Sequence, residues 1–235
     1  VIYNPVRTGR DVENLVHPDN SAFDYVFDAI RITRRALRPD IALIGFSGAP
    51  FTIASYMIEG GHSRNYSRTK QFMYTQSTAW HRLMKKLVET VSRYLAAQVD
   101  AGVHALQVFD SWVGCLSPGD YDEFVMPHMR RLFDSLARLG VPTIHFGTDT
   151  ASLLERFRDA GGDVIGVDWR IPLAEAWEKI GHDRAIQGNL DPAVLFASRD
   201  FIKSKVKEIL DAAGGRPGHI FNLGHGILPG TPPEN

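Results

Sequence analysis

The sequence contains a single cysteine, Cys115, among 235 residues. One cysteine excludes an internal disulfide, and without a second cysteine at metal-binding spacing it argues against a thiolate zinc site. No apolar run approaches the roughly 20 residues that span a bilayer, and the first residues form neither a signal peptide nor an Arg-rich transit helix. We therefore expect a protein of a reducing compartment, the cytoplasm, with no membrane association.

An excess of charge of either sign is also lacking. The 26 Lys and Arg residues are balanced by 27 Asp and Glu residues, which gives a formal net charge of −1. This balance gives no general reason to expect a nucleic acid or an acidic membrane surface as partner. No linker-like or low-complexity tract interrupts the chain, and 44% of its residues are hydrophobic. These features favour one domain over residues 1–235.

Several motifs of known chemistry are absent. The nine histidines include no His-Glu-x-x-His pair, which argues against metal catalysis. Ala49 stands where a Gly-x-Ser-x-Gly nucleophile elbow would need its last glycine. No Gly-x-Gly-x-x-Gly follows the first apolar strand, which weakens a dinucleotide-binding interpretation. We therefore expect no metal site.

What the sequence does contain is a repeated unit of helix, glycine and short apolar strand. A glycine just past a helix suits a left-handed cap. Near-continuous apolar strands that alternate with helices indicate an α/β protein with a parallel sheet covered on both faces. Six such units fit an incomplete (β/α)₈ TIM barrel, a fold of about 250 residues, better than an open doubly wound sheet. The glycines are Gly102, Gly140, Gly161, Gly162, Gly181, Gly214 and Gly215.

Further patterns predict the individual elements. We expect residues 1–18 to be irregular, a cap among residues 19–21 to start the first helix, and residues 41–46 to form the first strand. Apolar residues at four-residue steps predict a long helical region over residues 67–101. Pro127 is expected to split the helix that contains it.

Residues 45–61, GFSGAPFTIASYMIEGG, predict a strand that runs directly into a helix. Pro50 suits the first turn of that helix, and Tyr56 lies on the same side as Thr52. Taken alone, Tyr56 is a packing residue whose hydroxyl finds a local partner. The segment closely resembles a signature of the uroporphyrinogen decarboxylase family.

Polar and aromatic residues at strand ends are the other site candidates, because barrel active sites lie where strands meet the following loops. His225 lies between Gly224 and Gly226, whose freedom of backbone angle could turn the ring into the barrel mouth. Residues 222–226, NLGHG, resemble a second motif of the same family. The candidates are Phe46, Ser47, Phe109, Asp110, Ser111, His145, Asp168, Asn189 and His225; capping explains several of the polar ones equally well.

The resemblance implies a distorted TIM barrel and a haem-pathway reaction. Family members remove CO2 from the acetate side chains of uroporphyrinogen III, a small-molecule tetrapyrrole, to give coproporphyrinogen III without a cofactor. It implies that Tyr56 and His225 are catalytic and contact substrate, and that Ser111 binds a substrate carboxylate. Phe46 and Phe109 would line the apolar part of the site. It also implies a homodimer.

The family's other site residues, an aspartate and an arginine pair, belong to barrel units that would precede Val1. We therefore expect the chain to be a fragment that binds substrate weakly and has no measurable turnover. Two alternatives stay open. One is a zinc-dependent corrinoid or thiol methyltransferase of the same superfamily, for which His145 has no accompanying cysteine. The other is a non-catalytic porphyrin-binding relative.

Overall fold

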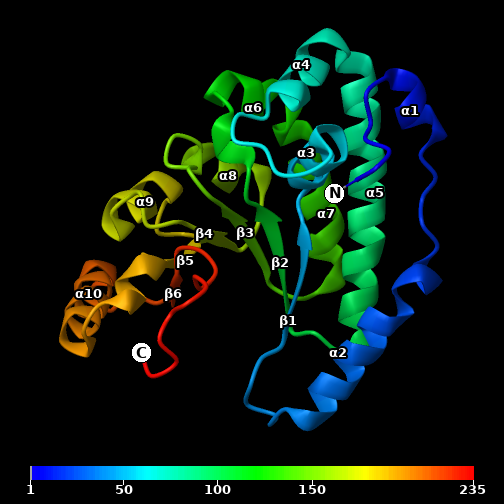
Figure 1. Cartoon of the computed structure of the whole chain (residues 1–235). Helices are drawn as coiled ribbons and strands as arrows, with labels where there is room; N and C mark the ends of the chain where they lie inside the picture. The colour runs from blue at the N-terminus through cyan, green and yellow to red at the C-terminus, as the bar shows by residue number, and fades with distance from the viewer. Residues whose placement is uncertain (1) are drawn as a thin grey trace.

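Six parallel strands form one sheet in which the spatial order is the chain order, β1-β2-β3-β4-β5-β6. The computed structural model describes residues 2–235, apart from the side chain of Asn20. Each strand pairs in parallel with the next one along the chain (Figure 1), which is the order of a β/α barrel and not of a doubly wound sheet. The strands are β1 (Ile44–Gly48), β2 (Ala105–Asp110), β3 (Thr143–Gly147), β4 (Val164–Gly166), β5 (Ala185–Leu190) and β6 (His219–Leu223).

Helices follow the strands and form a continuous outer layer, in which α5 packs on α7, α7 on α8, α8 on α9 and α9 on α10. The predicted strand–helix alternation is thus confirmed. The helices are α1 (Gly9–Asn14), α2 (Asp24–Ala36), α3 (Pro50–Glu59), α4 (Ser67–Thr75), α5 (Ser77–Ala101), α6 (Pro118–Phe124), α7 (Met126–Leu136), α8 (Leu154–Ala160), α9 (Leu173–Ile180) and α10 (Arg199–Ala213), with 3₁₀ turns η1 (Asn20–Phe23), η2 (Val113–Cys115), η3 (Ala137–Leu139) and η4 (Pro192–Phe196).

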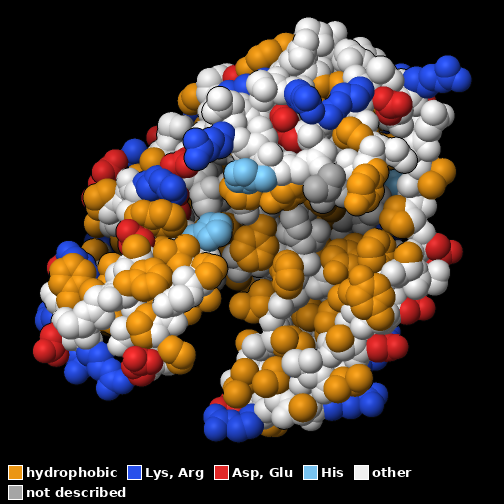
Figure 2. Space-filling model, viewed as in Figure 1, with side chains coloured by type: hydrophobic (Ala, Val, Ile, Leu, Met, Phe, Trp, Pro, Cys, Tyr) orange, Lys and Arg blue, Asp and Glu red, His pale blue; other side chains and the backbone are white. Residues whose placement is uncertain are grey.

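The sheet is open, and helices cover one of its faces. In the described residues β1 pairs with β2 and β6 with β5, but β1 and β6 do not pair with each other. The other face borders a hollow in which hydrophobic side chains gather (Figure 2). Ile44 and Phe46 of β1 are 45% and 61% exposed there. The expectation that helices cover both faces of the sheet is therefore wrong for β1. The face of β1 opposite the helices is the inner face of a barrel.

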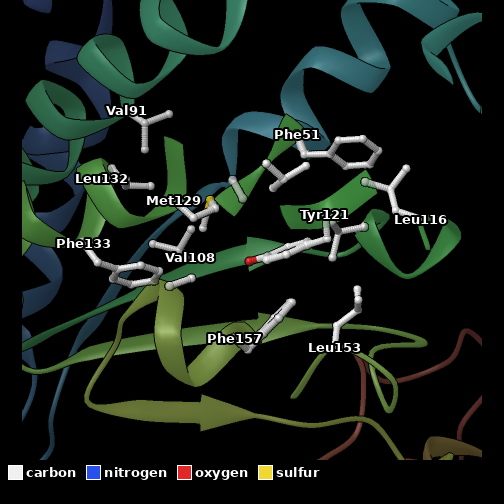
Figure 3. Packing of buried hydrophobic residues seen from close by; sticks show 14 of the residues in the cluster. Phe51, Val91, Val108, Leu116, Tyr121, Met129, Leu132, Phe133, Leu153 and Phe157 are labelled. Atoms are coloured by element: carbon white, nitrogen blue, oxygen red, sulfur yellow. The ribbon is translucent and has the colours of Figure 1, made fainter. Parts of the chain in front are cut away.

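Tight packing fixes β2 and β3 against the outer helices (Figure 3). Val108 of β2 lies in the same buried cluster as Phe51 of α3, Tyr121 of α6, Met129 of α7 and Phe157 of α8. Each large apolar side chain buried in this way stabilises the fold by about 1.5–3 kcal/mol. The cluster therefore gives β2 a rigid base, and His145 of β3 packs on Phe133 and Phe157 of the same cluster.

One expectation for the helices is wrong and another misses a break, and both differences involve the first residues of the chain. Thr8 and Asp11 form a capping box that starts α1 within the segment expected to be irregular. The helical region over residues 67–101 breaks at Gln76, whose side chain accepts a 2.9 Å hydrogen bond from the backbone N–H of Gly9 and donates to the carbonyl of Arg7. Gln76 leaves the helical conformation where it binds the N-terminal loop.

Other local predictions are confirmed. The helix around Pro127 divides into α6 and α7 at Val125, whose φ is −123°. Asp19 caps η1 by accepting a hydrogen bond from the N–H of Ser21, whereas the side chain of Asn20, another candidate cap, lies outside the described atoms. Gly102 ends α5 in the left-handed conformation. Over the described residues, no helix is long and apolar enough to cross a membrane.

Candidate functional site

Two cavities meet at the carboxyl ends of the strands, and Ser111 and His225 line both of them. We call the cavity of about 470 Å³ beside the inner sheet face the inner lobe. We call the cavity of about 650 Å³ nearer the surface the outer lobe. Two of the residues expected at the site, on different strand ends, are thus brought to one place.

An aromatic row runs along the inner sheet face, and two of its three rings line the inner lobe. Side chains alternate between the two faces of a strand, so Phe109 of β2 and Phe146 of β3, which pair in register, both point to the inner face. Their ring centroids lie 5.7 Å apart, and the ring of Phe46 lies 5.7 Å from that of Phe109, both in edge-on geometry. Phe46 therefore lies beside Phe109, but only Phe109 of this pair lines the inner lobe. Phe146 was missed, although it occupies the same strand-end position as Phe109.

Ser111 directly follows β2, and a hydrogen bond to its carbonyl oxygen holds it in place. The hydroxyl of Thr148 donates a short hydrogen bond to the carbonyl oxygen of Ser111. This contact ties the loop after β2 to the loop after β3. The serine side chain is left at the junction of the two lobes.

His225 is exposed in the loop after β6, with its ring centroid 6.5 Å from that of Phe146. Gly224 and Gly226 were expected to give the backbone unusual angles, but neither has a φ in the left-handed region. A Cβ on Gly224 would lie 2.6 Å from the backbone nitrogen of Trp169, whereas a Cβ on Gly226 would meet nothing within 4 Å. Gly224 therefore permits close approach of two loops, and Gly226 has no such constraint.

Tyr56 lies beside the outer lobe without lining it. Its ring, on α3, packs edge-on against Trp112 at 6.1 Å and is 40% exposed. The rings of His62 and Tyr66 also pack around Trp112, at 6.4 and 6.0 Å. Trp112, His62 and Tyr66 all line the outer lobe. Sequence analysis did not select them, and the available signal was their position in loops after the signature helix and after Ser111.

Charged groups in the outer lobe are arranged around Arg170. Its Nε lies 2.8 Å from Oδ1 of Asp149, its Nη1 lies 2.5 Å from Oδ2 of Asp168, and its guanidinium sits 4.3 Å from the centre of the Trp169 ring. Asn189 donates hydrogen bonds to the carbonyl oxygens of Asp168 and Ile171. Asp168 and Asn189, both candidates at the strand ends, thus hold loops in place and do not line either lobe.

Two other candidates face the helices and not the cavities. Asp110 is fully buried and accepts a hydrogen bond from the hydroxyl of Thr52 on α3. Burial raises the pKa of Asp110 to about 7, and the bond from Thr52 opposes that rise. His145 stacks on Phe157 of α8 at 3.9 Å, and burial lowers its pKa to about 3. His145 is thus neutral and remote from the site.

Ser47, the remaining candidate, is also buried, and its hydroxyl donates to the neighbouring carbonyl of Gly48. The site itself combines an apolar aromatic wall, the hydroxyl of Ser111, the imidazole of His225 and two arginines, Arg64 and Arg170. Such a combination suits a ligand with an apolar ring and anionic side groups.

Comparison with known families agrees with this chemistry. The family described as uroporphyrinogen decarboxylase (URO-D) matches residues 1–235. Curated relatives named uroporphyrinogen decarboxylase include that of Carboxydothermus hydrogenoformans, 56% identical over 237 residues, and that of Sorangium cellulosum, 54% identical over 233 residues. The chain is covered to 100% and 99% in these two alignments, and it spans 67% of the length of each relative.

A solved methyltransferase from Methanosarcina mazei has a similar fold. It superposes with a TM-score of 0.80 at 23% sequence identity, covering 94% of this chain and 65% of the other. A putative vitamin-B12 independent methionine synthase from Listeria monocytogenes superposes with a TM-score of 0.57 at 12% identity, covering 86% of this chain and 63% of the other. At such identities the likeness shows the fold alone.

Proposed function

The chain belongs to the uroporphyrinogen decarboxylase family, and from this premise we propose that it supplies the substrate pocket of a cofactor-independent carboxy-lyase. The reaction removes CO2 from the acetate side chains of uroporphyrinogen III and yields coproporphyrinogen III. The observation that carries the proposal is the junction of the two lobes, where Ser111 and His225 meet beside the aromatic row.

The chemistry needs an electron sink when an acetate on a pyrrole loses CO2. Protonation of the adjacent pyrrole carbon makes the ring itself that sink. The protein must then supply a proton donor, stabilise a cationic ring and hold the substrate carboxylates. The row of Phe46, Phe109 and Phe146 provides an apolar surface for the ring, and its contacts are edge-on.

In this proposal the hydroxyl of Ser111 donates a hydrogen bond to a substrate carboxylate at the junction. His225 and Tyr56 orient carboxylates and assist proton transfer. Tyr56 does not line the outer lobe but packs edge-on against Trp112, which does. Both rings are partly open to solvent, which leaves them accessible to a ligand.

The carboxylate that stabilises the cationic ring is not among the described lining residues. Asp149 lines the outer lobe but is paired with Arg170, and Asp110 is buried behind the strand. We therefore propose that this chain alone binds tetrapyrrole without turning it over, and that turnover needs groups from elsewhere in the enzyme. The methyltransferase alternative is not favoured, because His145 lies behind the sheet, packed on Phe157.

Family membership supports further proposals about the whole protein. These are a single domain over residues 1–235, a homodimer with the barrel mouths facing each other, and a cytoplasmic location. The buried cluster that extends from Val12 of α1 to Ala213 of α10 supports the first of these.

The test is uroporphyrinogen III decarboxylation by a polypeptide of the relatives' length that contains this chain. Tyr56→Phe, Ser111→Ala and His225→Asn should each lower kcat/KM by about a hundredfold to a thousandfold, the range expected for lost transition-state hydrogen bonds. Tyr25→Phe, at an exposed tyrosine on α2, serves as the control and should leave kcat/KM unchanged. A folded wild-type protein that does not decarboxylate the substrate would overturn the proposal.

A further inference from the structure

Arg64 lines the outer lobe from the loop between α3 and α4. This loop is anchored at both ends. Glu59, the last residue of α3, accepts hydrogen bonds of 2.9 Å from the N–H and the hydroxyl of Thr69 on α4. The N–H of Tyr66 donates to the hydroxyl of Ser63, and the buried ring of Tyr66 packs on Trp112.

The backbone of this loop is strained where it is anchored. Tyr66 has a φ of 49°, in the left-handed region that a side chain with a Cβ disfavours. Strained residues of this kind persist where their surroundings fix them, and they cluster at ligand-binding sites. The anchors therefore hold the segment that carries Arg64 against the rim of the outer lobe.

Arg64 is also the charge that remains available in this lobe. The charged residues that line it are Arg64, Asp149 and Arg170. Arg170 is neutralised by Asp149 and Asp168 and is stacked on Trp169. Arg64, by contrast, forms no ion pair within 4 Å in residues 2–235, and its side chain is exposed. An anion that enters the lobe thus meets one uncompensated guanidinium.

From this geometry we propose that Arg64 is a carboxylate-binding residue for the tetrapyrrole, and that it holds a propionate side chain in the outer lobe while an acetate lies at Ser111 and His225. The inference rests on the proposed function. A guanidinium suits this role because its planar fork binds both oxygens of a carboxylate. A propionate is retained through the reaction, so Arg64 holds substrate and product alike.

The experiment is a fluorescence titration of the purified chain with uroporphyrin III and coproporphyrin III, which are stable oxidised probes. Arg64→Ala should weaken binding of both porphyrins by about tenfold, the effect of one lost charge-assisted hydrogen bond. Arg64→Lys keeps the charge without the fork and should fall between Arg64→Ala and wild type. Raising the salt to about 0.5 M should shrink the difference, because the contact is partly exposed.

Arg68→Ala is the matched control. Arg68 is an exposed arginine on α4, four residues from Arg64 and outside both lobes, so its loss changes the net charge equally. The affinity of the Arg68→Ala variant for both porphyrins should stay within about twofold of wild type, as expected for a screened surface charge. Both changes are at exposed positions, and thermal unfolding of each variant checks that the fold is kept.

Each other outcome is decisive. If the wild type binds both porphyrins and Arg64→Ala binds them equally well, this inference is overturned and the proposed function stands. An equal loss in Arg68→Ala, or a loss confined to uroporphyrin, also overturns it, since the first indicates general charge attraction and the second an acetate contact. If the wild type binds neither porphyrin, the proposed substrate pocket fails and the inference fails with it.

Discussion

The hydroxyl of Thr52 donates a 3.2 Å hydrogen bond to Oδ1 of Asp110, and this contact joins α3 to the end of β2. The other oxygen of Asp110, Oδ2, has no hydrogen-bond partner among the described atoms. The pair lies directly behind Ser111 and one helical turn before Tyr56. Because an ionised carboxylate is costly in such a place, Asp110 couples the stability of the site to pH.

Asp110→Asn should change how stability depends on pH. The folded-state pKa of Asp110, about 7, lies above its unfolded value of about 3.9. Its favourable contribution is therefore fully present below pH 4 and is lost as the pH rises to about 7. Urea unfolding from pH 4 to pH 8 should show the wild type losing on the order of 4 kcal/mol more than the Asn variant, because each pKa unit of difference corresponds to about 1.4 kcal/mol. Parallel curves for the two proteins would show that Asp110 is not titrating in this range.

His128 should act in the opposite direction. Its Nε2 lies 2.9 Å from Nδ1 of His81, and burial, with smaller contributions from His81 and Arg131, lowers its pKa to about 4. A lowered folded-state pKa gives stability that is present above pH 6.5 and is lost as the pH falls toward 4. His128→Gln should lose less stability than wild type between pH 7.5 and pH 4.5 in urea unfolding. His62→Gln, at an exposed histidine, is the control. If His128→Gln loses as much unfolding free energy at low pH as the wild type and this control do, the prediction is contradicted.

Gly224 and Gly226 offer a matched pair around His225. A Cβ on Gly224 would press on the backbone of Trp169 and Asp168, whereas one on Gly226 would enter open space. Gly224→Ala should cost about 1–3 kcal/mol of unfolding free energy, as overpacking does, and should displace the loop that carries His225. Gly226→Ala should stay within about 0.5 kcal/mol of wild type. Equal unfolding midpoints in urea for the two variants would show that the approach of the two loops is not tight.

Cys115 should be unreactive in the native chain. Burial raises the pKa of its thiol to about 11, although Lys70 opposes the rise. The thiolate is the reactive form, and a free cysteine has a pKa near 8.5. Labelling with a disulfide reagent at pH 8 should therefore be roughly a hundredfold slower than in the urea-unfolded chain. Cys115 is half-buried at the outer lobe, so comparable rates in the two states would mean that the pKa of its thiol is not raised.

Local patterns were enough to predict the barrel order and several residues that lie together at the site. Glycines after helices and apolar strands mark each unit, and Pro127 marks the division between α6 and α7. Ser111 and Phe109 follow from their place at the end of β2. These features could be predicted because each depends on residues a few positions apart in the chain.

Features that depend on distant partners could not be predicted. The break at Gln76 is fixed by Gly9 and Arg7, 67 and 69 residues away. The strand that contains His145 and Phe146 is buried on both faces, so its sequence does not reveal which side chain points inward. The outer lobe is built from loops that are adjacent only after the sheet has formed.

The order of the strands has a consequence for how the protein is made. Each strand from β2 onward pairs with the strand that precedes it in the chain, so its hydrogen-bonding partner has already been synthesised. The sheet can therefore grow from its N-terminal side in step with translation. The outer lobe is completed last, because the loop that carries His225 follows β6.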